Sequence, residues 1–355
     1  MGTGKEISGT IDWLRFAMAA CVVLLHTGSL GADSPLLVYS SLCILFPQGI
    51  CRLAVPIFFF ISGYLFFSGL ENWDASVWYQ KAKRRFRSLV VPYFLWNLIA
   101  AVCIFSYSAL RARTGAIDPV SFQTFWTEWG GLRLFWDCDK GMPLDYPLWF
   151  IRNLIVFIAL TPLIFICIKK FHCSLIILIA ILYFSGVSSA LEGLLFFTSG
   201  AFFRIKGIDV LKSFSAVRIP ALVLSLLLLI CLIPSYNGAP EIYRICKGLF
   251  VITGTITTFN LVSSGISGGQ LKTNALLTSA SFFIFATHGI LILHDFARFI
   301  VMHILPGEGE WWYCAELFLR PGIAIGICLM LFILLDKICP SILKVLNGGR
   351  RLAIR

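Results

Sequence analysis

Long apolar stretches dominate the chain and are separated by short polar connections. A helix that crosses a bilayer needs about 20 mostly apolar residues, and the pattern predicts about ten such helices. The stretches lie near residues 11–30, 45–68, 88–108, 148–168, 173–186, 190–204, 219–235, 247–263, 279–303 and 315–337. The fifth and sixth are short and are expected to form a tight hairpin. The fold class expected is therefore all-α, a polytopic integral membrane protein.

Composition agrees with a membrane setting. Of the 355 residues, 58% are hydrophobic and only 13% are charged, and the mean hydropathy is +0.87. A soluble protein carries about 25% charged residues. The chain has no repeat period and no low-complexity linker, so residues 1–355 are expected to form one transmembrane domain.

The net charge of +11 is informative through its placement. The connections on one side of the membrane carry 18 basic residues, and those on the other side carry 6. The positive-inside rule assigns the side with more basic residues to the cytoplasm. Both termini are therefore expected there, in a multi-pass protein of the cytoplasmic (inner) membrane, and no nucleic-acid partner is expected. The richer side holds Lys5, Lys81, Lys83, Arg84, Arg85, Arg87, Lys169, Lys170, Arg204, Lys206, Lys212, Arg218, Lys272 and the tail from Lys337 to Arg355.

The first apolar stretch, "IDWLRFAMAACVVLLHTG", carries three ionisable residues: Asp12, Arg15 and His26. At 3.6 residues per turn, His26 lies about 20° past three full turns from Arg15, about 16 Å along the same helix face. Asp12 lies one turn before Arg15 on nearly that face. A charged group at membrane depth costs at least about 2.5–3.5 kcal/mol and usually faces a protein interior or a cavity. The alternative is a snorkelling anchor at Arg15 and a packing role for His26.

A second stripe occurs in "SFFIFATHGILILHDFARF". His288 and Asp295 are seven residues apart, so a regular helix places them on one face with Arg298 beside it. His288 stands in an otherwise apolar turn beside Gly289. The alternative for Asp295 and Arg298 is a structural ion pair near the outer surface.

Two arginines near the outer side complete the candidate residues. Arg52 is expected near the outer end of the second span, and Arg152 lies one turn after Trp149 in "YPLWFIRNL". A Trp/Arg interfacial anchor is the alternative for Arg152. Ser62 and Gly63 are expected to serve close helix packing. The twelve cysteines show no Cys-x-x-Cys pair and no Cys/His spacing suited to zinc, so no metal is expected.

Several segments, taken in order, resemble the integral membrane acyltransferase 3 family. The Arg-x10-His pattern of Arg15 and His26 resembles the family's first span, although the usual "LDGLRG" is "IDWLRF" here and lacks a glycine. "RLAVPIFFFISGYLF", "KAKRRFRSLVVPYFLW", "PLWFIRNLIVFIALTPL" and "SFFIFATHGILI" are similar to later family segments. The resemblance covers nearly the whole chain and corresponds to the stand-alone form, without the C-terminal esterase-like domain of larger members.

The resemblance implies an O-acyltransferase. Family members acylate sugars of lipopolysaccharide, capsule, peptidoglycan and Nod factors. The implied partners are an acyl-CoA donor, with acetyl-CoA preferred, a glycan or lipid-linked sugar acceptor, and the lipid bilayer; no bound cofactor is implied.

The same resemblance implies roles for the candidate residues. Asp12, Arg15 and His26 are the expected catalytic residues, with Arg15 toward the donor and His26 as a general base or an acyl carrier. Arg84 and Arg85 are expected to bind the donor. The expected acceptor or oxyanion residues are Arg52, Arg152 and His288. A secondary transporter or a non-catalytic partner in polysaccharide assembly is the alternative, although the two similar halves of many transporters are not evident.

Overall fold

A computed structural model describes residues 4–137, 139 and 141–350. Over these residues the chain is built from helices, with no β-strand. Cys138, Lys140 and the last five residues lie outside the described part. The α-helices are α1 (Gly4–Leu25), α2 (Leu37–Leu45), α3 (Ala54–Phe66), α4 (Ala75–Arg113), α5 (Pro119–Glu128), α6 (Trp149–Ala159), α7 (Thr161–Phe171), α8 (Ser174–Phe184), α9 (Ala190–Ile205), α10 (Val210–Ala216), α11 (Arg218–Gly238), α12 (Pro240–Ser267), α13 (Ala275–Thr287), α14 (Glu310–Ile338) and α15 (Pro340–Leu346). Short 3-10 turns cover Ile50–Leu53, Gly131–Leu134 and Tyr146–Leu148, and π-helical segments cover His288–Ala297 and Ile300–Ile304.

The all-α, multi-pass membrane architecture is confirmed. Seven helical stretches of the described chain are long and apolar enough to cross a membrane, and there are up to eight if α6 and α7, which meet at a 62° bend, form one crossing. Ten crossings would also require α8 and α9 to span. The 11 residues of α8 extend only about 16 Å, against a hydrocarbon core of about 30 Å. The count of ten therefore stays a prediction.

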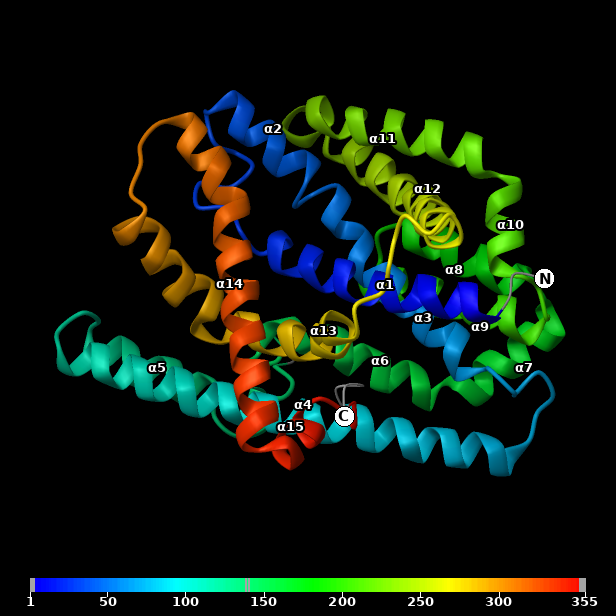
Figure 1. The fold of residues 1–355 in the computed structure, drawn as a ribbon, viewed down its shortest axis with the longest axis horizontal. Helices are drawn as coiled ribbons and strands as arrows, with labels where there is room; N and C mark the ends of the chain where they lie inside the picture. Colours follow the sequence, from blue (N-terminus) through cyan, green and yellow to red (C-terminus); the bar gives the residue numbers. More distant parts are fainter. Residues whose placement is uncertain (1–3, 138, 140, 351–355) are drawn as a thin grey trace.

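Helix α1 occupies the middle of the bundle and packs against α3, α12, α13 and α14 (Figure 1). It begins earlier and ends earlier than the predicted 11–30 span, so His26 is the first residue after the helix. Asp12 and Arg15 lie on the same continuous helix. The predicted separation of Arg15 and His26 by about three helical turns therefore applies, because the α-helix between them is unbroken up to Leu25.

The basic segment "KAKRRFR" lies inside a helix and not in a connection. Helix α4 runs for 39 residues, from Ala75 to Arg113, with Pro92 in its interior. Asp74 caps its first turn by accepting hydrogen bonds from the amides of Ser76 and Val77. The arginines of this segment are consequently held at helical spacing on one element, and Arg85 lines a cavity that Arg15 of α1 also lines.

Glycines allow α3 and α9 to cross in direct backbone contact. A Cβ atom on Gly63 would lie 2.0 Å from the carbonyl oxygen of Phe197, and one on Gly200 would lie 2.0 Å from that of Phe60. No larger side chain fits at either position. The packing role expected for Gly63 is confirmed.

The predicted helix 279–303 is interrupted directly after His288. Ile290 and Leu291 have non-helical backbone angles, and Leu291 has φ of +60°, a conformation that costs a bulky residue roughly 1–3 kcal/mol. The regular spacing that predicted a common face for His288 and Asp295 is therefore wrong for this segment. The chain is kinked here, so the residues after Leu291 do not continue the axis of α13.

Candidate active site

Two histidines from distant parts of the sequence stack on each other at the ends of α1 and α13. The rings of His26 and His288 have centroids 5.6 Å apart and planes 24° from parallel. His288 is fully buried, whereas His26 is partly exposed. The structure thus brings together the two histidines that the sequence singled out in separate stripes.

The hydrogen bonds of His288 define its tautomer. Its Nδ1 lies 2.9 Å from the carbonyl oxygen of Phe285 and 3.2 Å from that of Ile284. Carbonyl oxygens only accept, so Nδ1 carries the proton and donates it. In a neutral ring the lone pair is then on Nε2, which is buried and has no hydrogen-bond partner. His288 therefore holds an unused proton acceptor beside His26.

Tyr146 and His294 extend this pair toward the surface. The ring of Tyr146 meets that of His26 edge-on, with centroids 4.8 Å apart, and its hydroxyl lies 3.2 Å from Nε2 of the exposed His294. Close approach of Tyr146 requires Gly289, because a Cβ there would lie 3.1 Å from the tyrosine ring and 2.9 Å from Pro147. We call His26, His288, Tyr146 and His294 the histidine cluster.

Sequence reasoning missed Tyr146 and His294. In a regular helix, two residues six positions apart, such as His288 and His294, point about 120° away from each other. The break at Leu291 changes this direction, and His294 reaches the hydroxyl of Tyr146. Tyr146 begins a short 3-10 turn at the end of a long connection, where periodicity gives no signal.

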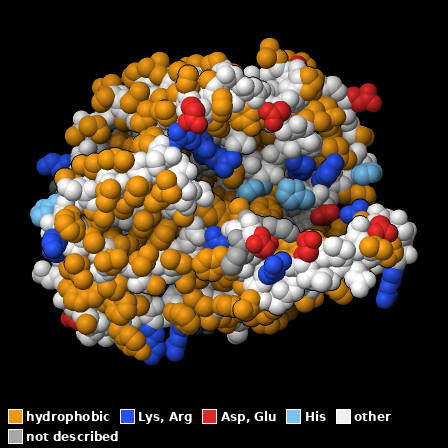
Figure 2. All heavy atoms as spheres, turned by 180° about the vertical axis from the view of Figure 1, so that it is seen from behind, with side chains coloured by type: hydrophobic (Ala, Val, Ile, Leu, Met, Phe, Trp, Pro, Cys, Tyr) orange, Lys and Arg blue, Asp and Glu red, His pale blue; other side chains and the backbone are white. Residues whose placement is uncertain are grey.

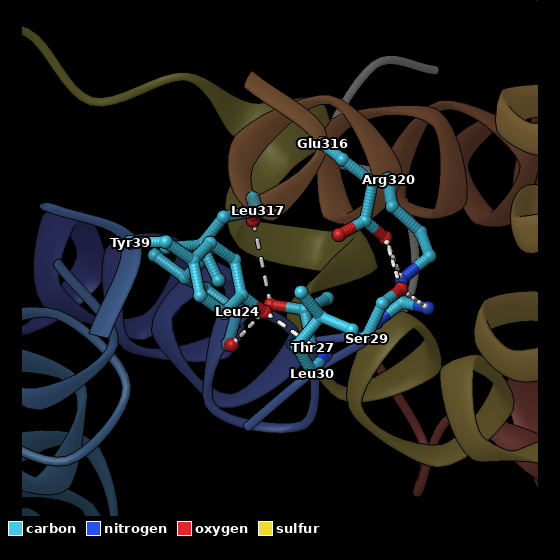
Figure 3. Close-up of polar contacts among 8 residues, drawn as sticks. All are labelled: Leu24, Thr27, Ser29, Leu30, Tyr39, Glu316, Leu317 and Arg320. Carbon is cyan, nitrogen blue, oxygen red and sulfur yellow. Dashed lines mark hydrogen bonds and ion pairs between the residues drawn. The ribbon is translucent and has the colours of Figure 1, made fainter. Parts of the chain in front are cut away.

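The turn that follows His26 is anchored to α14 by buried polar groups (Figure 3). Glu316 and Arg320 form an ion pair of 3.0 Å, and their side chains are 0% and 4% exposed. The hydroxyl of Ser29 donates to Oε1 of Glu316 at 3.1 Å and accepts from Nη1 of Arg320 at 3.3 Å. Thr27 bonds the carbonyl oxygens of Leu24 and Leu317. These contacts fix the backbone on which His26 is carried.

Arg15 lies near the middle of α1, three helical turns before His26, and faces a cavity. Its Nη1 pairs with Oδ1 of Asp12 at 2.6 Å. The cavity has a volume of about 90 Å³, and Arg85 and Arg350 also line it. One of the two predicted donor residues therefore shares a cavity with Arg15. Arg84 instead lines a neighbouring depression together with Arg85.

Aromatic side chains form another part of the cavity wall. The rings of Phe58, Phe150 and Phe285 contact one another with centroids 5.7–6.3 Å apart. Phe285 also contacts His288, at a centroid distance of 6.3 Å. The cavity thus extends from the three arginines to a residue in contact with the histidine cluster.

The remaining predicted residues lie around these two features. Arg52 donates to Gln48 at 2.6 Å, leaves Nε buried without a hydrogen-bond partner, and is within electrostatic reach of His26. Arg152 donates to the carbonyl oxygen of Gly141 and lies over the ring of Trp136. Its side chain therefore contacts the loop that precedes Tyr146.

Polar groups reach the surface near the cluster. Figure 2 shows histidine, basic and acidic side chains gathered across the middle of one face, within otherwise largely hydrophobic surface. Asp295 contacts Tyr107 of α4. No group of three or more His, Cys, Asp or Glu in the described residues is arranged to hold a metal ion.

Asp145 adds an unusual carboxyl group next to Tyr146. Its side chain is buried, and neither carboxylate oxygen has a hydrogen-bond partner. Its backbone is paired: the amide donates to Oδ1 of Asn97 at 3.0 Å, and the carbonyl oxygen accepts from the amide of Leu148 at 2.9 Å. Burial without a compensating partner raises the pKa of the Asp145 carboxyl well above its ordinary value.

A protein-family model described as an acyltransferase domain, Acyl_transf_3, matches residues 9–335. The chain belongs to this acyltransferase family. The match covers α1 through nearly all of α14 and so includes the whole histidine cluster and Arg15. The resemblance seen in the sequence is confirmed, and the protein is a multi-pass membrane acyltransferase.

A relative extends this result over the full length. The chain is 24% identical over 361 residues to the succinoglycan biosynthesis protein ExoH of Rhizobium meliloti (strain 1021), which covers 97% of this chain and 93% of ExoH. No solved structure matches the chain.

Proposed function

We propose that this acyltransferase moves an acyl group, with acetyl preferred, from cytoplasmic acyl-CoA to a hydroxyl group of a cell-envelope or exported glycan. The cavity carries the proposal, because it connects three arginines with a residue that contacts the histidine cluster. Guanidinium groups suit the phosphates of CoA, and the aromatic wall suits the pantetheine arm. ExoH is named for the biosynthesis of a glycan, which supports a glycan acceptor.

In direct transfer, the acceptor hydroxyl oxygen attacks the thioester carbonyl carbon and the C–S bond breaks. His26 takes the hydroxyl proton, and that proton then protonates the departing CoA thiolate. His288 supplies a second proton acceptor, its unpartnered Nε2. Arg15, oriented by Asp12, holds the donor, with Arg85 and Arg84 beside it.

In the alternative chemistry, a histidine carries the acyl group. A nitrogen of His26 attacks the thioester and releases CoA thiol, and the glycan hydroxyl then attacks the acyl-imidazole. The acceptor approaches from the exposed His294 and Tyr146 side in either scheme. Arg52, near His26, orients the acceptor, and Arg152 acts on the acceptor side through the loop that it holds.

Purified full-length protein in nanodiscs provides the test. With ¹⁴C-acetyl-CoA and the lipid-linked glycan fraction of the producing cells, label should enter the glycan while CoA thiol is released. Label retained on the protein without acceptor would identify the acyl-histidine route. A secondary transporter or a non-catalytic partner would leave acetyl-CoA intact, and that result would refute the proposal.

A further inference from the structure

Three guanidinium groups face one cavity, and one of them is paired with a carboxylate. Arg15 comes from α1, Arg85 from α4 and Arg350 from the segment after α15. Of the carboxylates that the structure describes, Asp12 is the one paired with any of the three, at 2.6 Å from Arg15. Like charges gathered in a partly desolvated space destabilise one another. The arrangement therefore favours an anion inside the cavity.

Arg350 reaches the cavity because the chain after α14 folds back on the bundle (Figure 1). The indole N–H of Trp96 donates to the carbonyl oxygen of Leu346 at 3.0 Å. The side-chain amide of Asn347 donates to the carbonyl oxygen of Ser279 at 2.9 Å. Gly348 has φ of +66°, and a Cβ there would lie 2.5 Å from the carbonyl oxygen of Ser88. The return of the chain is thus specified by contacts to α4 and α13.

The side chain of Arg350 is held in place within this wall. Its guanidinium lies 5.2 Å from the ring centroid of Phe282, which also lines the cavity. Arg350 as a residue is exposed, but desolvation of its guanidinium against the cavity wall, followed by the charges of Arg15 and Arg85, lowers its pKa to about 10. The group stays positively charged at neutral pH, so all three arginines are cations in the working protein.

We infer that Arg350 is a donor-binding residue that, with Arg15 and Arg85, forms a site for the phosphate groups of the nucleotide part of acyl-CoA. This inference rests on the proposed function and adds to it a residue from the C-terminal segment. Guanidinium groups bind phosphate oxygens through paired, charge-assisted hydrogen bonds, and the three arginines come from separate elements. A site of this kind exists only when α15 is docked, which couples donor binding to the C-terminal segment.

The test measures CoA binding to the full chain in nanodiscs of zwitterionic phosphatidylcholine by isothermal titration calorimetry. Wild-type protein should bind CoA, and Arg350→Gln should weaken binding roughly 10- to 100-fold, the effect of losing a charge-assisted hydrogen bond. Arg350→Lys should recover binding only in part, because an ammonium cannot match the planar fork. Adenosine 3′,5′-bisphosphate should show the same order among the variants, which assigns the effect to the phosphates.

The matched control is Lys344→Gln, which removes an exposed basic residue from α15 itself and should leave CoA affinity unchanged. Equal affinity in wild type and Arg350→Gln would overturn the inference while leaving the donor proposal intact. Equal weakening by Lys344→Gln would show that the loss of any basic residue in this segment weakens binding, and it would also overturn the inference. Loss of the Arg350→Gln effect when phosphatidylglycerol replaces phosphatidylcholine would assign the arginines to a lipid headgroup instead. Failure of the wild type to bind CoA would refute the donor proposal itself.

Discussion

The imidazole rings of His26 and His288 stack 5.6 Å apart although 262 positions separate them in the chain. Two rings this close do not both carry a full positive charge without strong repulsion. His288 donates from Nδ1 to backbone carbonyls and keeps Nε2 without a partner. The pair is therefore suited to hold one proton in transit at a time.

Replacement of either histidine by glutamine tests this arrangement. Glutamine keeps hydrogen bonding but cannot shuttle a proton, so His26→Gln should lower acyl transfer by about 10²–10⁴-fold, and by more if His26 carries the acyl group. His288→Gln should also lower it. CoA thiol release from acetyl-CoA is the measurement.

His303→Gln is the matched control, because His303 is exposed and stacks on Phe299 outside the histidine cluster. It should retain wild-type turnover. Near-normal transfer in His26→Gln would exclude His26 as the base and leave His288 as the candidate.

The Arg15 guanidinium is predicted to bind the donor. Arg15→Ala should raise the KM for acetyl-CoA about tenfold or more, since it removes a charge-assisted contact, with a smaller effect on kcat. Arg15→Lys should recover little of the loss. Arg87→Ala, an exposed residue of α4, is the control. An unchanged KM in Arg15→Ala would reduce Arg15 to a membrane anchor.

The sequence predicted the part of the site that depends on one regular helix. Asp12, Arg15 and the level of His26 follow from helical spacing because α1 is continuous from Gly4 to Leu25. The approach of His288 to His26 depends on tertiary packing of α13 against α1, which periodicity does not encode. His288 was still recognisable, because an imidazole in an apolar turn is costly without a role.

The sequence could not predict residues placed by irregular backbone or by the folded-back chain end. His294 joins Tyr146 only because of the break at Leu291, and a left-handed leucine has no sequence signature. Arg350 entered the sequence argument as one cytoplasmic charge among many. Its place beside Arg15 depends on the docking of α15, which involves Asn347 and Gly348.

The hydrogen bond between Tyr146 and His294 gives a further prediction. Tyr146→Phe keeps the edge-on contact with His26 but removes the hydroxyl, so it should lower kcat while thermal stability changes by only about 1 kcal/mol. Gly289→Ala should have a larger effect, because its Cβ would displace Tyr146 and Pro147. Thiol release and melting curves would measure both. Full activity in Gly289→Ala would show that the position of Tyr146 is unimportant.

Asp145 predicts a pH-dependent stability term. Its carboxyl titrates near pH 4 in an unfolded chain, but burial raises its pKa in the folded protein. The folded state then binds the extra proton, so this contribution is present at low pH and is lost as pH rises from about 4 through the folded-state pKa. Asp145→Asn removes the term.

The measurement is the melting temperature of both proteins in detergent between pH 4.5 and 8. The variant should gain relative to wild type as pH rises, and the difference should level off once wild-type Asp145 is ionised. Parallel pH profiles in the two proteins would contradict the assignment of a neutral carboxyl at this site.

The buried pair of Glu316 and Arg320 is predicted to stabilise the fold and to position His26 through Ser29. Glu316→Gln leaves the Arg320 guanidinium buried without its counter-ion, which costs about 3–5 kcal/mol, so the melting temperature should fall markedly. Ser29→Ala removes only the link to the turn after His26 and should cost about 1 kcal/mol.

If the link positions His26, Ser29→Ala should lower kcat more than its small stability loss explains, with KM for acetyl-CoA unchanged. The double variant Glu316→Gln/Arg320→Met should recover stability relative to Glu316→Gln, because no uncompensated charge is left. A Ser29→Ala protein with wild-type kcat would confine the Glu316–Arg320 pair to a structural role.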